Sequence, residues 1–157
     1  MTTFPHWRGR RLRRTGALRA LVRETRLTPD RLILPLFVTE GRGVREPVES
    51  MPGVFRTSVD FAMKDVGEAA LLGLGGVLLF GIPDQKDAEG SQAWHEQAAV
   101  QRTAAAINKA HPDLTVVTDV CLCEYTEHGH CGLLVDGQVD NDATIDLLAR
   151  TAVSHAR

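Results

Sequence analysis

Residues 76–82, GVLLFGI, form a run of strand length without a charged or strongly polar side chain. Strands in parallel sheets that are covered by helices have this composition, because neither of their faces meets water. A similar run, LILPLFVTEG, occupies 32–41, although its Pro35 cannot donate a hydrogen bond to a neighbouring strand. The β-branched stretch DLTVVTDV at 113–120 is a third candidate. The three runs predict three strands, and the one at 76–82 is predicted to be buried on both faces.

Helices are predicted between and after these strands. Ser58 is a candidate N-cap for a helix over about 60–73, which the following glycines would close. Good helix formers fill 94–110, whereas the Pro- and Gly-containing stretch 45–58 is predicted to be a loop. A last apolar stripe at helical spacing consists of Ile145, Leu148, Ala149 and Ala152. Strands that alternate with helices predict an α/β fold built from βαβ units around a parallel sheet.

The first 31 residues differ from the rest of the chain in charge. They contain nine arginines and two acidic residues, whereas the whole chain has a net charge of −2. A short amphipathic helix is predicted over 15–26, where Leu18, Leu21 and Val22 recur among arginines. We expect this arm to dock on an acidic protein surface. We expect no nucleic-acid partner, because the arm has few aromatic residues, Phe4 and Trp7, and no binding motif follows it.

The composition, 43% hydrophobic and 24% charged, is that of a globular domain. No apolar run is long enough to span a membrane, and the N-terminus lacks the apolar stretch of a secretory signal. We therefore expect no membrane partner and a cytoplasmic location, where thiols stay reduced. Clustered cysteines in that compartment more often bind metals or act in catalysis than form disulfides.

All three cysteines lie within eleven positions of one stretch, DVCLCEYTEHGHCG. If 114–122 is extended, Asp119, Cys121 and Cys123 project in the same direction from the end of the strand. Cys131 can return to them from the loop that follows, because glycines there let the backbone turn tightly. Three thiolates suit a soft or borderline ion such as zinc. The cluster therefore predicts a metal site.

The residues alone leave several alternatives open. The zinc could be catalytic, with a free position, or structural, with His128 or His130 as fourth ligand. A histidine beside a metal loop is more often a hydrogen-bonding neighbour than a ligand. Unligated buried thiols and redox chemistry are other interpretations, and the role of Tyr125 is ambiguous. Ser91 and Trp94 follow the second strand, where α/β barrels place functional residues, but they indicate no particular chemistry.

The stretches together resemble one family, porphobilinogen synthase, also called delta-aminolevulinic acid dehydratase. TDVCLCEYTEHGHCG resembles its zinc-binding stretch, and the three-cysteine pattern is typical of its zinc-dependent branch. Further stretches resemble the family in its order and spacing: RGRRLRRTGALRALVRETRLTPDRLILPLFVTEG, REPVESMPGVFR, LFGIPDQKDAEGSQAW and VDNDATIDLLARTAVSHA. The resemblance covers residues 8–157.

The resemblance implies a (β/α)8 TIM barrel, of which 32–157 would form the first half. Residues 1–31 would be an extended, partly helical arm that wraps a neighbouring subunit of a homo-oligomer, usually an octamer. The family condenses two molecules of 5-aminolevulinate into porphobilinogen in tetrapyrrole and heme synthesis, with loss of two waters. Cys121, Cys123 and Cys131 match its zinc ligands, and Asp119 matches an active-site acidic residue.

The chain also departs from the family. The resemblance places two Schiff-base lysines in the second half of the barrel, and Lys64, Lys86 and Lys109 match neither of them. We therefore expect a truncated product, a fragmentary gene model or one piece of a split enzyme, inactive by itself. The alternative hypothesis is a non-catalytic zinc-binding or assembly module that associates with a full-length homologue.

Overall fold

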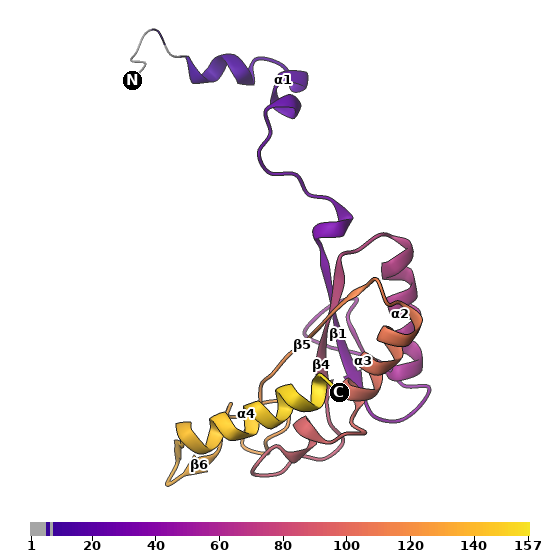
Figure 1. Ribbon diagram of the computed structural model, residues 1–157, viewed down its shortest axis with the longest axis vertical. Coiled ribbons are helices and arrows are strands. Elements are labelled where there is room, and N and C mark those ends of the chain that lie inside the picture. Colours follow the sequence, from indigo (N-terminus) through magenta and orange to yellow (C-terminus); the bar gives the residue numbers. More distant parts are fainter. Residues whose placement is uncertain (1–5, 7) are drawn as a thin grey trace.

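A five-stranded sheet with two helices on one face forms the body of the chain (Figure 1). The structure is a computed structural model that describes residue 6 and residues 8–157. The strand order is β2-β3-β1-β4-β5, with β3, β1, β4 and β5 parallel and β2 antiparallel at one edge. The strands are β1 (Ile33–Thr39), β2 (Arg45–Pro47), β3 (Phe55–Ser58), β4 (Gly76–Ile82) and β5 (Thr115–Thr118). The predicted α/β fold with a parallel sheet is confirmed.

Strand β1 accommodates Pro35 even though it lies inside the sheet. Pro35 is opposite Leu78 of β4, and pairing with β3 begins only at Phe37. At the level of Pro35, one edge of β1 is therefore unpaired within the described chain. A proline is tolerated where a ladder is incomplete, because its missing N–H then removes less hydrogen bonding.

The prediction that 45–58 is entirely a loop is wrong. Strands β2 and β3 lie at its two ends, and β3 pairs in parallel with β1. The two strands are joined by a turn around Gly53, which has a φ of +83°. Both strands are too short to show an apolar pattern in the sequence, and their pairing with the rest of the sheet defines them.

Helices α2 (Val59–Leu71) and α3 (Ala99–Ala110) lie side by side on one face of the sheet (Figure 1). Ser58 is the N-cap of α2 as predicted, but its hydroxyl donates to Asp60 Oδ1 at 2.7 Å instead of capping the helix. The main core between sheet and helices consists of Leu36, Val38, Ala62, Val66, Ala69, Val77, Leu79, Ala99, Val100, Ala104 and Ile107. These small and branched side chains fix the distance between the two layers.

The other face of the sheet is less covered than the sequence predicts. Burial alternates along β4, so that Val77 and Leu79 are buried and Leu78 and Phe80 only half-buried. On this second face the rings of Phe37 and Phe80 stack with centroids 5.3 Å apart. The expectation that the strand at 76–82 is buried on both faces is therefore wrong for the described residues, in which helices cover one face only.

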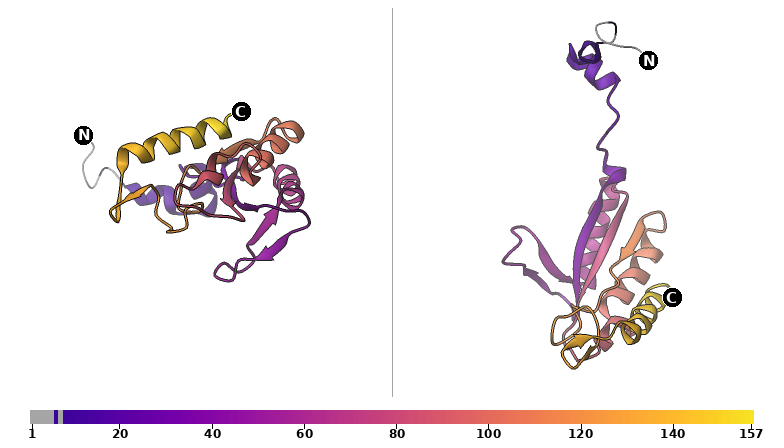
Figure 2. Two further views of the ribbon diagram at one scale, coloured as in Figure 1. Left: turned by 90° about the horizontal axis from the view of Figure 1, so that it is seen from below. Right: turned by 90° about the vertical axis from the view of Figure 1, so that its left-hand side faces the viewer.

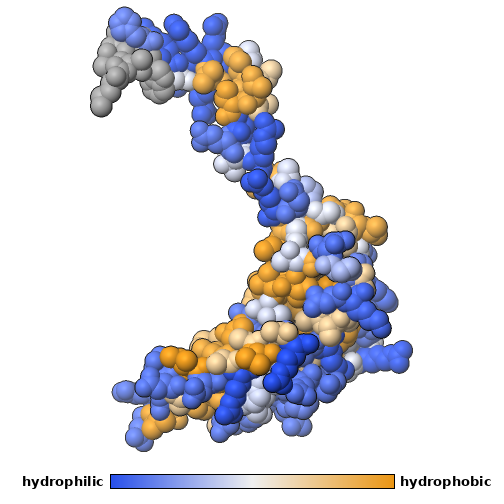
Figure 3. Space-filling model, viewed as in Figure 1, coloured by the Kyte–Doolittle hydropathy of each residue, from blue (hydrophilic) through white to orange (hydrophobic). Residues whose placement is uncertain are grey.

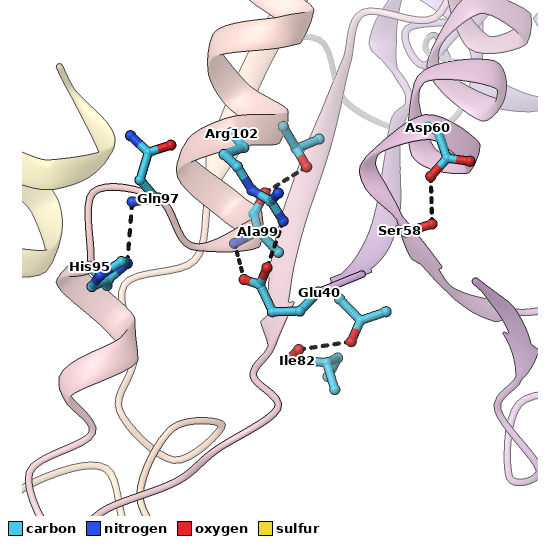
Figure 4. A network of polar contacts seen from close by, with 10 residues as sticks. Glu40, Ser58, Asp60, Ile82, His95, Gln97, Ala99 and Arg102 are labelled. Carbon is cyan, nitrogen blue, oxygen red and sulfur yellow. Dashed lines mark hydrogen bonds and ion pairs between the residues drawn. The ribbon is translucent and has the colours of Figure 1, made fainter. Parts of the chain in front are cut away.

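Glu40, directly after β1, holds the N-terminus of α3 (Figure 4). One carboxylate oxygen accepts the N–H of Ala99 at 2.6 Å, and the other accepts from Arg102 Nη2 at 2.6 Å. The N-cap residue Ala98 has no side-chain acceptor, so Glu40 takes over its role from a different element. This contact ties the start of α3 to the carboxyl end of the sheet.

The last described elements are a short hairpin and a helix. Strands β6 (Leu134–Val135) and β7 (Gln138–Val139) precede α4 (Asn141–His155), whose cap Asp140 accepts from Ala143 N at 3.1 Å. The predicted apolar stripe of α4 faces the body of the chain only at Leu148, which packs half-buried against the small core of Ala93, Leu122, Tyr125 and Leu147. Ile145 is 54% exposed, and the helix instead buries Thr144, Leu147 and Thr151.

The N-terminal segment extends away from the sheet (Figures 1 and 2). It contains the short helical segments η1 (Gly9–Arg13), α1 (Gly16–Leu21) and η2 (Pro29–Arg31), none of which has a buried residue. Helix α1 ends five residues earlier than the predicted 15–26. No apolar side chain of this helix is buried against the described residues of the chain, and Leu21 is 76% exposed. Phe4 and Trp7 lie outside the described residues. No helix in the described part of the chain has the length and apolar character of a membrane span.

Candidate metal centre

The two first cysteines lie in a loop beyond the end of β5. The strand ends at Thr118. Beyond it, the N–H of Asp119 still donates a hydrogen bond to Leu79 O of β4 at 3.0 Å. The prediction of an extended chain to residue 122 is therefore wrong. Leu122 is fully buried and its carbonyl accepts the N–H groups of both Tyr125 and Thr126 at 2.9 Å, which turns the chain. The chain therefore turns to bury Leu122 and does not continue as a strand.

The three sulfur atoms nevertheless converge. The Sγ atoms of Cys121, Cys123 and Cys131 all lie within 4.8 Å of one another, and those of Cys121 and Cys123 are 3.4 Å apart. Zinc–sulfur bonds of about 2.3 Å place two sulfurs on a tetrahedral ion about 3.8 Å apart. All three cysteines are free thiols, the first two half-buried and Cys131 exposed. The donor set and its spacing fit a zinc ion.

The surroundings of Cys123 and Cys131 disfavour ionisation of these two thiols in the absence of a cation. Burial raises the pKa of Cys123 to about 12, and the neighbouring Cys121 thiol and Glu124 carboxyl add to this effect. The pKa of Cys131 is also raised, first of all by its hydrogen bond to Cys121. Because metal ligation requires thiolates, binding of an ion here would release protons.

Two carboxyl groups lie beside the thiols. Asp119, Cys121 and Glu124 form a second group whose ligand atoms are all within 4.8 Å of one another. Burial, together with the charge of Asp119, raises the pKa of Glu124. The structure thus brings the predicted Asp119 to the cluster and adds Glu124, which sequence reasoning missed. Its position directly after Cys123 was the only available signal.

His128 and His130 do not join the thiol cluster. Both ring nitrogens of His128 are engaged, since Nε2 lies 3.2 Å from Ala88 O and Nδ1 accepts the N–H of His130 at 3.2 Å. In this arrangement Nε2 carries the proton and Nδ1 has no free lone pair for an ion. The groups of possible metal ligands among the described residues contain no histidine. The structure favours His128 as a hydrogen-bonding neighbour of the metal loop.

A second, smaller core holds residues 119–132, the cysteine loop, in place. Ala93, Leu122, Tyr125 and Leu147 are buried together, so that the segment η3 (Ser91–Trp94), the cysteine loop and α4 meet. The Tyr125 hydroxyl occupies the space above Gly81 of β4, where even a Cβ atom would lie only 1.9 Å from it. Burial also raises the pKa of Tyr125, which keeps its hydroxyl neutral. Tyr125 therefore anchors the loop.

The remaining residues considered from the sequence lie elsewhere. Ser91 donates a hydrogen bond to Asp87, and with Trp94 it lines a cavity of about 560 Å³ between η3 and α4 that none of the cysteines lines. Lys64, Lys86 and Lys109 are exposed. Lys64 lies over the ring of Phe61, 4.3 Å from its centroid, on the outer surface of α2. The lysines are thus not part of the cysteine cluster.

Comparisons with known proteins agree with the resemblance seen in the sequence. A family model described as "Delta-aminolevulinic acid dehydratase" matches residues 6–157. The delta-aminolevulinic acid dehydratase of Halalkalibacterium halodurans is 51% identical over 150 residues, which are 96% of this chain and 46% of that protein. The same enzyme of Synechocystis sp. is 49% identical over 157 residues, 98% of this chain and 48% of that protein.

A solved structure has the same fold over the matching region. The crystal structure of delta-aminolevulinic acid dehydratase from Toxoplasma gondii ME49, in complex with the reaction product porphobilinogen, superimposes with a TM-score of 0.89 at 34% identity. The match covers 96% of this chain and 44% of that one. The chain therefore spans about half the length of the relatives that it matches, and its sheet corresponds to part of their barrel.

Proposed function

Because the chain belongs to the delta-aminolevulinic acid dehydratase family, we propose that it supplies the metal-binding part of a porphobilinogen synthase. Cys121, Cys123 and Cys131 would hold one zinc ion. The observation that carries this proposal is the convergence of their three sulfur atoms within 4.8 Å, from two separate points of one loop. The proposed location is the cytoplasm, which keeps such thiols reduced.

The proposed reaction is the condensation of two molecules of 5-aminolevulinate into porphobilinogen. When bound, zinc would supply Lewis acidity toward a substrate oxygen. The carboxylate of Asp119 lies beside Cys121 and can accept a hydrogen bond from a substrate amine. Buried Leu122 and Tyr125 support the loop from below and keep these groups in place. The site lies beyond the carboxyl end of β5, where α/β barrels place their active sites.

Metal analysis tests the zinc site. We expect about one zinc per wild-type chain, and a loss of most of it in Cys123→Ser. His130→Ala is the matched control, because this exposed side chain is adjacent to Cys131 but outside the cluster. Equal zinc content in the wild type and Cys123→Ser would overturn the assignment, and a loss in His130→Ala would make this histidine a fourth ligand.

We further propose that these 157 residues alone do not form porphobilinogen. In the family, as the sequence resemblance implies, the substrates are held as imines on two lysines, and Lys64, Lys86 and Lys109 are all exposed. An amine forms such an imine readily when burial or a neighbouring cation lowers its pKa. Loss of covalent positioning gives up roughly 7–11 kcal/mol of barrier reduction.

A trapping experiment decides the question of activity. The zinc-loaded chain is incubated with 5-aminolevulinate, reduced with borohydride and examined by intact mass. We expect no adduct and no porphobilinogen. A reduced adduct on one of the three lysines would contradict the proposal and identify a catalytic amine.

The exposed arm supports a second proposal, assembly with other copies. Its helical segments bury no residue within the chain. Two apolar side chains of the arm, Leu21 and Leu27, are 76% and 85% exposed. We propose that residues 1–31 dock on a neighbouring subunit. Sedimentation of the chain with and without these residues tests this, and an unchanged mass distribution would contradict it.

A further inference from the structure

The loop that follows β4 is hydrogen-bonded to the cysteine loop through the backbone of Asp87. The N–H of Asp87 donates to Tyr125 O at 3.3 Å, and the N–H of Glu127 donates to Asp87 O at 3.0 Å. Asp87 thereby forms an isolated parallel bridge with Thr126. These bonds hold the middle of the loop, between Cys123 and Cys131.

The side chain of Asp87 fixes the shape of its own loop. Oδ1 accepts the N–H groups of Glu89, Gly90 and Ser91 at 3.0, 2.5 and 3.0 Å, and Oδ2 accepts from the Ser91 hydroxyl. These bonds, that of the Ser91 hydroxyl first, lower the pKa of the Asp87 carboxyl, so it is ionised at neutral pH. A charged acceptor with four donors makes a rigid turn.

The turn also brings the two loops into close contact. Gly90 has a φ of +73°, and a Cβ atom there would lie 3.2 Å from Cβ of Tyr125. Glycine satisfies both the left-handed backbone and the narrow space. The conformation that the Asp87 carboxylate stabilises is therefore the one that lets the loop approach Tyr125.

The path from this bridge to Cys131 is short. The Thr126 hydroxyl donates to His130 O at 2.9 Å, and the N–H of Gly129 donates to Thr126 O at 3.3 Å. The turn that returns Cys131 toward the other thiols thus begins at the residue opposite Asp87. In contrast, buried Leu122 separates Cys121 from Cys123 and anchors both of them directly.

We propose that Asp87 is a positioning residue of the metal centre, which sets the place of Cys131 relative to Cys121 and Cys123. This inference rests on the proposed zinc site. It assigns the two halves of the site to different supports, since the core holds Cys121 and Cys123 and the Asp87 turn holds Cys131. Loss of Asp87 should therefore mimic loss of the Cys131 thiol more than loss of the fold.

The test measures metal affinity and thiolate ligation in the 157-residue chain. Zinc affinity is obtained by competition with a chromophoric chelator, and Co²⁺ reports bound thiolates through its sulfur-to-metal charge-transfer absorption. We expect Asp87→Ala to bind zinc about 10- to 100-fold more weakly. Its absorption per bound Co²⁺ should fall toward that of Cys131→Ser, whereas Asp87→Asn, which keeps an acceptor oxygen, should recover part of both losses. Asp84→Ala, exposed on the same loop, is the control and should match the wild type.

The outcomes separate the two proposals. A wild-type chain that binds Co²⁺ without thiolate absorption overturns the metal centre and the role of Asp87 in it. A wild type that binds through thiolates, with unchanged affinity and absorption in Asp87→Ala, overturns the role of Asp87 alone. Where circular dichroism shows that Asp87→Ala does not fold, Ser91→Ala removes a single hydrogen bond. It should weaken zinc binding about threefold, and unchanged binding would overturn the inference.

Discussion

Helices α3 and α4 have similar lengths but very different surroundings. Helix α3 lies against β1, β4 and β5 and buries six of its residues, and Ile107 among them is fully buried. Helix α4 contacts η3 and part of α3 and buries three, while Ile145 is 54% exposed. The difference teaches that an apolar stripe identifies a helix, but that the neighbouring layers decide which face is buried.

Helix α4 has apolar side chains on two sides. One side packs through Leu147 into the small core beneath the cysteine loop. Elsewhere on the helix Ile145 is 54% exposed, and Val153 is 52% exposed beside the cavity between η3 and α4. Figure 3 shows hydrophobic surface along this helix. The described sheet ends at β5, and the relatives are about twice as long as this chain. The exposed apolar side chains of α4 are thus suited to contact a further layer of the barrel.

The largest difference is expected from a matched pair of isoleucines. Ile107→Ala in α3 should lower the free energy of unfolding by about 2–5 kcal/mol, because it leaves a cavity in the main core. Ile145→Ala in α4 should change it by only about 0.5 kcal/mol, as at most surface positions. Urea unfolding of both variants at low chain concentration measures this. Similar losses in the two would show that α4 is packed as tightly as α3.

The N-termini of the two helices should also differ in sensitivity. Glu40→Ala leaves the Ala99 N–H and the Arg102 guanidinium without their shared acceptor, and we expect a loss of about 1–3 kcal/mol. Asp140→Ala removes only a local cap of α4, with an expected loss of about 1 kcal/mol. Glu40→Gln keeps an acceptor oxygen and should fall between Glu40→Ala and the wild type. The expected order is reversed if the cap of α4 carries more of the stability than the contact between β1 and α3.

The fold was predictable where a segment carries its own pattern. The run at 76–82 corresponds to β4 residue for residue, and the helices over 60–73 and 94–110 are found with shifted boundaries. Strands β2 and β3 were missed because they have three and four residues, and their pairing partners are distant in sequence. Short strands depend on tertiary contacts that no local pattern encodes.

The site divides in the same way. The sequence predicts that the three cysteines converge, and their sulfur atoms do so. The route differs, because the strand before them ends at Thr118 and not at residue 122. The sequence gives no sign of the roles of Glu124, Asp87 and Glu40. Each acts on a loop or helix that comes near it only in the folded chain. An acidic residue in a loop has no sequence signal that separates it from a solvated one.

The exposed Ile145 and Val153 side chains of α4 should promote self-association of the isolated chain. Replacement of Ile145 and Val153 by lysine should weaken association at least about tenfold, or about 1.4 kcal/mol, because charges oppose burial at these two positions. Ala105→Lys, an exposed position on α3, is the control and should have no such effect. Sedimentation equilibrium over a range of concentrations measures the change. A wild-type chain that stays a compact monomer throughout would contradict this expectation.

The smallest expected effect concerns the end of α4 nearest to α3. There the Gln101 amide of α3 donates to Ser154 Oγ at 3.0 Å, and the adjacent His155 has no hydrogen-bond partner for either ring nitrogen within the described residues. Burial lowers the pKa of His155 below its ordinary value of 6.5, and the negative charge of Asp119 opposes this only in part. Glu96 and Arg157 line the same cavity of about 350 Å³ and are the other charged groups that face it.

The sign of the pH effect follows from this lowered pKa. As the pH falls below 6.5, the unfolded chain takes up a proton on His155 before the folded chain does, so the folded state loses stability. His155→Gln, which cannot titrate, should flatten the decline in the free energy of unfolding between about pH 7 and pH 5. Comparison at pH 8, where the imidazole is neutral in both states, removes any effect of the substitution on packing. An equally steep decline in the variant would mean that this end of α4 is already hydrated, and that its contact with α3 is looser than the bond between Gln101 and Ser154 indicates.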